Sequence, residues 1–297
     1  MMSAVQMLIF VIPLIAVLLF FLIVMIRDSH RFVVVKYHIT SPKLRKKCRI
    51  VMLSDLHNKE YGEQNERLLQ AVREQKPDLI LMAGDMVTAN GEKTRVRAPL
   101  RFICRLAKEY PVYYGIGNHE YRMKIYKEDY GDIYEDYARE LKKCGVRLLE
   151  NERIYLPEYN MEICGLEMER LYYKRFRRSR MDRQYIKSLL GTGRTDCMEL
   201  LIAHNPDYFE QYAAWGAELV LAGHVHGGVV RLPLAGGVIS PSVHLFPKYD
   251  GGLYEEYGSR MILGRGLGVH TIPIRIFNPG ELVVVELDRY RPNINEW

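Results

Sequence analysis

Two histidines lie close together in a glycine-rich stretch, Gly223-His224-Val225-His226-Gly227-Gly228, which directly follows an apolar run ending at Ala222. On an extended backbone, side chains two residues apart point to the same side, so we expect both imidazole rings to face one pocket. The flanking glycines permit a sharp turn and the close approach of a ligand. Taken alone, the stretch is typical of either a metal site or a surface turn, so other candidate ligands must decide between them.

Residues of the types that bind metal ions also follow four earlier apolar runs. Five of the nine histidines in the chain lie in such positions. Taken singly, each residue could be a helix cap, a turn residue or a buried structural histidine. Their recurrence after five apolar runs instead predicts one shared metal site. The candidates outside the glycine-rich stretch are Asp55, His57, Asp85, Asn118, His119 and His204.

The elements that must position these residues alternate between short β-rich runs and amphipathic stretches. This alternation predicts an α/β sandwich, in which ligands gather at the carboxyl ends of the strands. The periodicity predicts helices over residues 64–76 and 96–108. The predicted strands are 48–53, 79–83, 112–116, 146–149, 161–164, 199–203, 218–222, 261–263 and 282–287.

The ordered motifs resemble those of the calcineurin-like metallophosphoesterases, over residues 48–287. The motifs are Asp55-x-His57, Gly84-Asp85, Gly117-Asn118-His119-Glu120, His204 after a strand, and Gly223-His224-x-His226. The resemblance implies a four-layer αββα sandwich and a site for two metal ions. It also implies that His119 contacts the phosphate and protonates the leaving oxygen. By the same resemblance the first ion is held by Asp55, His57 and His226, the second by Asn118, His204 and His224, and both by Asp85.

Carboxylate, amide and imidazole ligands suit Mn²⁺, Fe, Co²⁺ or Zn²⁺, and the residue types do not choose among these ions. Two ions about 3.5–4 Å apart can clamp a phosphate and lower the pKa of a bridging water. The hydroxide formed from that water would attack the phosphorus, so we expect no side-chain nucleophile.

The N-terminal region contains an uncharged apolar run over residues 7–26, which spans about 30 Å as a helix, the thickness of a bilayer core. No basic residue precedes it and no small-x-small site follows it, which favours a membrane anchor over a cleaved signal peptide. Eight Lys and Arg residues follow it by residue 49, so the positive-inside rule predicts a cytoplasmic domain. The expected organisation is an anchor (1–27), a basic juxtamembrane linker (28–47), the metallophosphoesterase domain (48–287) and a short tail (288–297).

The net charge of +6 includes this basic cluster, so an anionic lipid surface is a natural partner. The chain has no nucleic-acid-binding motif, which makes nucleic acid an unlikely partner. The five cysteines are an odd number without CxxC spacing, and we expect no disulfide or zinc framework from them.

Two further stretches bear on the substrate. Residues 170–180 carry six basic and three aromatic residues, a composition typical of either a lipid-headgroup contact or a solvated loop. Arg265 and Arg275 are candidates to meet a substrate phosphate. Tyrosines at helical spacing after the Gly-Asn-His-Glu motif predict core packing, with an aromatic wall beside the metals as the alternative. These tyrosines are Tyr126, Tyr130, Tyr134 and Tyr137.

The sequence therefore predicts a phosphodiesterase or pyrophosphatase that acts on a membrane-associated lipid or a nucleotide-linked glycolipid. It is similar to the membrane-associated bacterial-type members of the family, such as the UDP-2,3-diacylglucosamine pyrophosphatases. The alternatives are a membrane-tethered, non-catalytic scaffold of the same fold and, more distantly, a nuclease.

Overall fold

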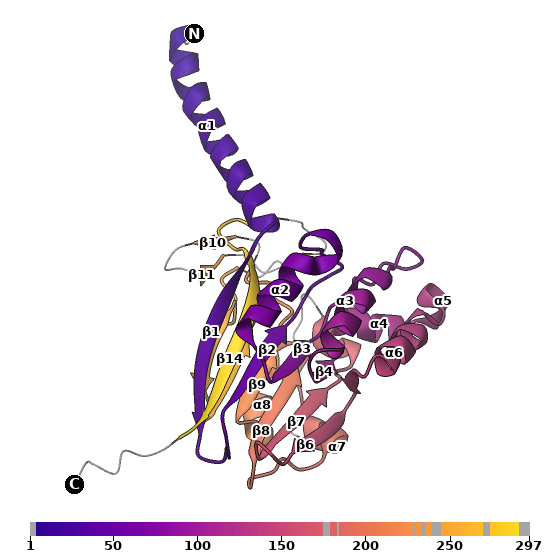
Figure 1. Cartoon of the computed structure of the whole chain (residues 1–297). Helices are drawn as coiled ribbons and strands as arrows, with labels where there is room; N and C mark the ends of the chain where they lie inside the picture. The colour runs from indigo at the N-terminus through magenta and orange to yellow at the C-terminus, as the bar shows by residue number, and fades with distance from the viewer. Residues whose placement is uncertain are drawn as a thin grey trace, which may run out of the picture.

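The computed structural model describes residues 4–174, 179–182, 184–228, 230–232, 236–238, 245–269 and 274–290, with side chains from residue 10 onward. Helix α1 (Ala4–Ser29) projects from an α/β body (Figure 1). Its segment Phe10–Ser29 has a mean hydropathy of 2.9 and is long enough to cross a membrane. This agrees with the expected anchor.

Two six-stranded sheets form the body. The first has the order β1-β14-β2-β3-β4-β5, and only β14 and β2 pair antiparallel within it. Its strands are β1 (Phe32–Ser41), β14 (Gly280–Arg289), β2 (Cys48–Leu53), β3 (Leu79–Ala83), β4 (Val112–Gly115) and β5 (Arg147–Leu149). The second has the order β12-β13-β9-β8-β7-β6, parallel in its centre and antiparallel at both edges. Its strands are β12 (Gly252–Glu256), β13 (Ser259–Leu263), β9 (Leu219–Ala222), β8 (Met198–Ala203), β7 (Met161–Leu166) and β6 (Glu152–Leu156).

Helices cover the outer faces of both sheets, and three apolar cores separate the four layers. The middle core lies between the sheets, where Ile50 and Leu81 of the first join Leu200 and Leu221 of the second. Over the first sheet lie α2 (Glu66–Gln75), α3 (Arg97–Ala107), α4 (Asn118–Ile125), α5 (Lys127–Tyr130) and α6 (Ile133–Lys143); over the second lie α7 (Tyr185–Leu190) and α8 (Phe209–Trp215). The described residues also form short elements: η1 (Glu63–Asn65), η2 (Arg170–Tyr173), η3 (Pro206–Tyr208), β10 (Arg231–Leu232) and β11 (Gly236–Gly237). The predicted αββα sandwich is confirmed.

Strand β1 lies within residues 28–47, where we expected a basic linker. It pairs in parallel with β14 along its whole length. The β-branched run Val33-Val34-Val35 suits a strand, and the interspersed polar residues fit the exposed side of an edge strand. The basic residues of this region had favoured a linker, so the alternation was not interpreted as a strand. Core packing is confirmed for Tyr130, Tyr134 and Tyr137, which are buried, whereas Tyr126 is only partly buried. The four tyrosines do not share one helix, because Tyr126 and Tyr130 lie at the two ends of α5 and the other two lie on α6.

A disulfide joins Cys104 of α3 to Cys144 at the end of α6, which corrects the expectation of no disulfide. The two cysteines are 40 residues apart in sequence, but their helices pack together and bring the Cα atoms to 5.3 Å. The spacing along the chain gives no sign of this pair, because only the packing of the helices creates it. Cys48, Cys164 and Cys197 are buried free thiols.

Candidate metal centre

The predicted ligands lie in the loops that leave the carboxyl ends of the strands, and many of these loops turn through positive φ. Asp55 (φ 50°) and His57 (φ 48°) follow β2, and Asp85 (φ 54°) follows β3. His224 (φ 77°) and His226 (φ 53°) follow β9. Residues other than glycine seldom adopt this region, at a cost of about 1–3 kcal/mol each, and such residues cluster at functional sites.

The backbone at His224 and His226 is thus a tight turn and not the extended segment we expected. The N–H of Gly228 donates to the carbonyl of Val225, 2.9 Å away, which closes the turn. Both rings still reach the site, but they enter two different groups of side chains. An extended backbone would place the two rings on one side. The positive φ values at His224 and His226 turn the backbone instead, so the two side chains point to different groups.

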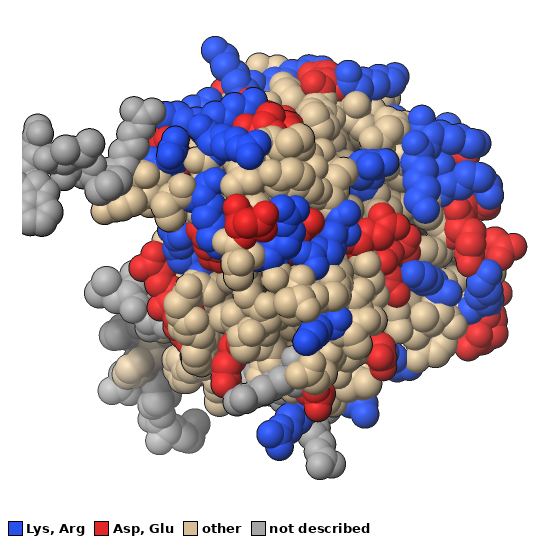
Figure 2. All heavy atoms as spheres, turned by 90° about the horizontal axis from the view of Figure 1, so that it is seen from below, with Lys and Arg blue, Asp and Glu red and all other residues tan. Residues whose placement is uncertain are grey.

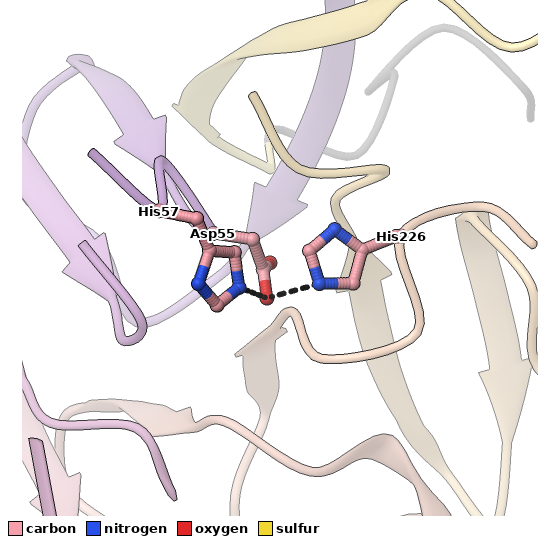
Figure 3. Close-up of side chains that lie close together, drawn as sticks. All are labelled: Asp55, His57 and His226. Carbon is pink, nitrogen blue, oxygen red and sulfur yellow. Dashed lines mark ion pairs between the residues drawn. The ribbon is translucent and has the colours of Figure 1, made fainter. Parts of the chain in front are cut away.

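The first group consists of Asp55, His57 and His226, all buried (Figure 3). Asp55 Oδ1 lies 3.5 Å from His226 Nε2 and 4.0 Å from His57 Nε2. The two imidazole rings stack with their centroids 5.0 Å apart. One carboxylate oxygen and two ring nitrogens therefore point to one position from two distant parts of the chain.

The second group consists of Asp85, His204 and His224. Asp85 Oδ2 lies 3.1 Å from His204 Nε2 and 3.8 Å from His57 Nε2, so this carboxylate adjoins both groups. Asn118 begins α4, and its buried Oδ1 has no hydrogen-bond partner in the part of the chain that the structure describes. A buried oxygen of this kind suits a metal ligand.

Hydrogen bonds to the far side of the rings orient the histidines. His204 Nδ1 lies 2.6 Å from the carbonyl of Ala83, and His226 Nδ1 lies 3.1 Å from the carbonyl of Gly268. A carbonyl only accepts, so each Nδ1 carries a proton and each ring directs Nε2 into the site, where a bound ion displaces any proton that Nε2 carries. This is the arrangement usual for histidines that bind metal ions. The residues therefore fit a metal centre.

The charges of the site point the same way. Burial raises the pKa of Asp55 to about 6. Burial also acts to raise the pKa of Asp85, but the neighbouring imidazoles outweigh it and hold this pKa well below its usual value. At His204 burial lowers the pKa, yet Asp85 and Asp55 outweigh it and raise the pKa to about 10. The buried carboxylates thus favour positive charge beside them, which divalent ions supply when bound.

His119 lies beside these groups, with its ring centroid 4.9 Å from that of His57. Its backbone N–H donates to Asp85 Oδ1 at 2.8 Å. Its Nδ1 accepts the N–H of Ala89 at 2.9 Å, so the neutral ring carries its proton on Nε2. An N–H at that nitrogen can donate a hydrogen bond to a phosphate oxygen or to a leaving oxygen.

Glu120 has a positioning role that the sequence did not reveal. This buried carboxylate accepts the N–H of Asp85 (2.9 Å), of Gly117 (3.0 Å) and of Val87 (3.2 Å). The hydroxyl of Tyr114 also donates to it at 2.6 Å. Glu120 therefore joins the loop after β3 to the loop after β4. The only signal in the sequence was its place directly after His119.

Tyr173 was likewise missed as a site residue. Its ring lies against His224, with centroids 5.3 Å apart, and 6.1 Å from the ring of His204. Burial, with the nearby phenol of Tyr212 and the carboxylate of Asp85, raises the pKa of Tyr173 well above its usual value, so the hydroxyl stays protonated. Residues 175–178 of the same basic and aromatic stretch lie outside the described residues.

The two arginines that were candidates to meet phosphate bond to groups of the protein. Arg265 Nε donates to Glu281 Oε2 at 2.8 Å. Arg275 is buried and donates to the carbonyls of Arg265, Gly266 and Gly268. The carbonyl of Gly268 also accepts a hydrogen bond from His226 Nδ1–H. Arg275 therefore supports the loop that orients this candidate ligand.

An arginine forms ion pairs within a separate group of side chains that could also hold a metal ion. The group consists of Glu162, Cys164 and Glu199. Arg153 Nε lies 3.1 Å from Glu162 Oε2, and its Nη2 lies 3.2 Å from Glu199 Oε1. The guanidinium supplies the positive charge that a metal ion would otherwise provide, so we interpret this group as an ion-pair cluster.

An αββα sandwich that brings buried carboxylates and imidazoles together at its strand ends defines a class of protein with a candidate metal site. The particular family follows from comparison: the chain belongs to the calcineurin-like phosphoesterases, whose family model matches residues 48–228.

Similar proteins occur in distant organisms. An uncharacterized metallophosphoesterase of Campylobacter jejuni is 27% identical over 83% of this chain, which spans 60% of that protein's length. A transmembrane protein with metallophosphoesterase domain from Danio rerio is 25% identical over 80% of this chain and 53% of its own. The crystal structure of TT1561 from Thermus thermophilus aligns with a TM-score of 0.45 at 12% identity, covering 73% of this chain and 88% of that one.

Proposed function

We propose that this metallophosphoesterase is a phosphodiesterase or pyrophosphatase that acts on a membrane-associated lipid or a nucleotide-linked glycolipid, with two divalent ions as cofactors. The observation that supports a membrane substrate is a direct connection between the anchor and the site. Asp28, in the last turn of α1, accepts the N–H of Asn278 at 3.0 Å. Asn278 Nδ2 in turn donates to the carbonyls of His226 and Gly228, each at 2.7 Å. The end of the membrane helix is thus attached to the loop that carries a candidate ligand.

Each side chain of the site has a distinct role in this proposal. Asp55, His57 and His226 would hold one ion, and Asn118, His204 and His224 the other, with Asp85 shared. Divalent ions, when bound, neutralise charge on the phosphate and lower the pKa of a coordinated water. His119 would donate a hydrogen bond from Nε2 to the leaving oxygen, and the phenol of Tyr173 would donate to a phosphate oxygen.

The test is metal content together with substrate preference of the full chain in detergent micelles. We expect two ions per chain and cleavage of bis-(p-nitrophenyl) phosphate in preference to p-nitrophenyl phosphate. Chelation should abolish cleavage, and Mn²⁺, Fe²⁺ or Zn²⁺ should restore it. A lipid-linked pyrophosphate should be cleaved faster than either nitrophenyl ester. Preference for the monoester, or equal turnover of lipid-linked and water-soluble diesters, would contradict the proposal.

His119→Ala should slow hydrolysis by about 10²–10⁴-fold for diesters with poor leaving groups, the range typical of general acid catalysis. A diester with a p-nitrophenol leaving group needs little protonation, so its loss should be much smaller. The measurement is kcat/KM for two diesters that differ in leaving-group pKa, with bound metal as a check. His38→Ala, at an exposed position on β1, is the matched control. An equal loss for both substrates would count against the acid role.

We further propose that the domain faces the cytoplasm, as the basic residues after α1 favour. The Cys104–Cys144 disulfide in the structure favours the opposite, oxidising side and therefore provides the test, because cytosolic thiols are kept reduced. A cytoplasmic domain predicts that rapid alkylation of intact cells with a membrane-permeant reagent modifies both cysteines. The measurement is mass spectrometry of the two peptides. A fully oxidised pair in cells would place the domain on the opposite, oxidising side.

A further inference from the structure

Four large apolar side chains are exposed near the point where α1 enters the body. They are Leu232 (46% exposed), Leu245 (67%), Phe246 (65%) and Phe277 (38%), which we call the apolar rim. Exposed large apolar groups that gather in one place mark an interaction surface, whereas scattered ones do not.

Backbone contacts show that the segments carrying these four residues lie next to one another. Val230 pairs with Ile276, so the segment before Leu232 runs beside the segment that carries Phe277. The N–H of Val238 donates to the carbonyl of Val230, and the N–H of Phe246 donates to the carbonyl of Val238, each at 2.9 Å. In Figure 1, β10 and β11 lie beside the lower end of α1.

The apolar rim is continuous with the membrane helix. The ring of Phe277 lies 6.3 Å, between centroids, from both Phe20 and Phe21 of α1. Phe21 lies about 12 Å along the helix axis from Ser29, the last residue of α1, at 1.5 Å per residue. The ring of Phe277 therefore lies beside the apolar part of α1 and not at its end. When α1 occupies a bilayer, this ring must lie at the depth of the lipid.

The body is also held at a defined orientation to the helix. Asp28 is buried, bonds to the N–H of Asn278, and pairs with Arg31 at 2.8 Å. Strand β1 follows α1 almost directly and joins the first sheet along ten residues. The face at α1 therefore stays toward the bilayer. The opposite face, seen in Figure 2, carries Lys and Arg interspersed with Asp and Glu, as expected for a surface in water.

We infer that the apolar rim inserts into the headgroup and acyl boundary of the bilayer that holds α1. Phe246 supports this inference, because it has φ 47°, an uncommon conformation for an aromatic residue, and its side chain is 65% exposed. Lipid would cover this surface as it covers the apolar face of an interfacial helix. Insertion holds the turn of His224 and His226 next to the lipid surface, since Asn278 bonds to that turn. The inference concerns membrane contact and goes beyond the proposed reaction.

The experiment measures depth directly and needs no activity. The full chain is reconstituted in phosphatidylcholine vesicles with one cysteine introduced by Phe246→Cys and labelled with an environment-sensitive fluorophore. Tyr290→Cys, 53% exposed just beyond the end of β14, is the matched control. The three native free thiols are buried, and the unsubstituted protein shows whether they take up label.

We expect a blue-shifted emission for the label at position 246 and at least twofold quenching by lipids with a nitroxide near the headgroup. The label at position 290 should show the spectrum of a dye in water and little quenching. Leu245→Cys gives a second label position and covers the case in which Phe246→Cys does not fold. If labels at positions 245 and 246 behave like the label at position 290, the inference is wrong.

Discussion

Asp85→Asn is expected to lower kcat/KM for a phosphodiester by on the order of 10³-fold, more than the 10–100-fold typical of residues that only support a ligand. Asp85 Oδ2 lies 3.1 Å from His204 Nε2 and 3.8 Å from His57 Nε2, so it adjoins both groups of ligands. Asparagine keeps the shape but removes the charge. Bound metal should fall from two ions per chain to one or none, measured by elemental analysis of the purified protein.

The matched control for this prediction is Asp196→Asn. Asp196 pairs with Arg194 at 2.6 Å and its side chain is 67% exposed, so its charge can be removed at little cost. We expect full metal content and unchanged kcat/KM in this variant. Full metal content together with kcat/KM within tenfold of wild type in Asp85→Asn would show that this carboxylate does not bind the ions.

Glu120→Ala is expected to reduce the free energy of unfolding by about 3 kcal/mol or more. The substitution leaves the buried N–H groups of Asp85, Gly117 and Val87 without their acceptor, and each unsatisfied group costs about 1–3 kcal/mol. Tyr114→Phe removes one donor and leaves the carboxylate in place, so its cost should be nearer 1 kcal/mol. Urea denaturation of the metal-free chain in detergent gives both values.

Two further measurements separate positioning from simple packing. Glu120→Gln keeps the volume of the side chain but turns one acceptor into a donor. We expect its free energy of unfolding to lie between those of Glu120→Ala and Tyr114→Phe. We also expect it to bind metal more weakly than wild type. Glu74→Ala, on the exposed face of α2, should change stability by less than about 0.5 kcal/mol. A Glu120→Ala protein as stable as Glu74→Ala would contradict the role of this carboxylate.

The amino-acid sequence determined the αββα class, the family and the candidate site to a large extent, because each motif is local. A β-rich run followed directly by Asp55-x-His57 or Gly84-Asp85 places its polar residues at a strand end whatever the rest of the chain does. The uncharged run within α1 is equally local. The assignment of each residue to one of two ions remains a prediction, which Asp85→Asn tests.

Tertiary structure alone decided the features that depend on contacts between distant parts of the chain. Cys104 meets Cys144 only because α3 packs on α6, and β1 becomes a strand because β14 supplies a partner some 250 residues later. Asn278 links Asp28, 250 residues before it, to His226, 52 residues before it. Such pairs leave no periodicity or spacing in the sequence, since the packing and hydrogen bonds that stabilise them exist only in the folded chain.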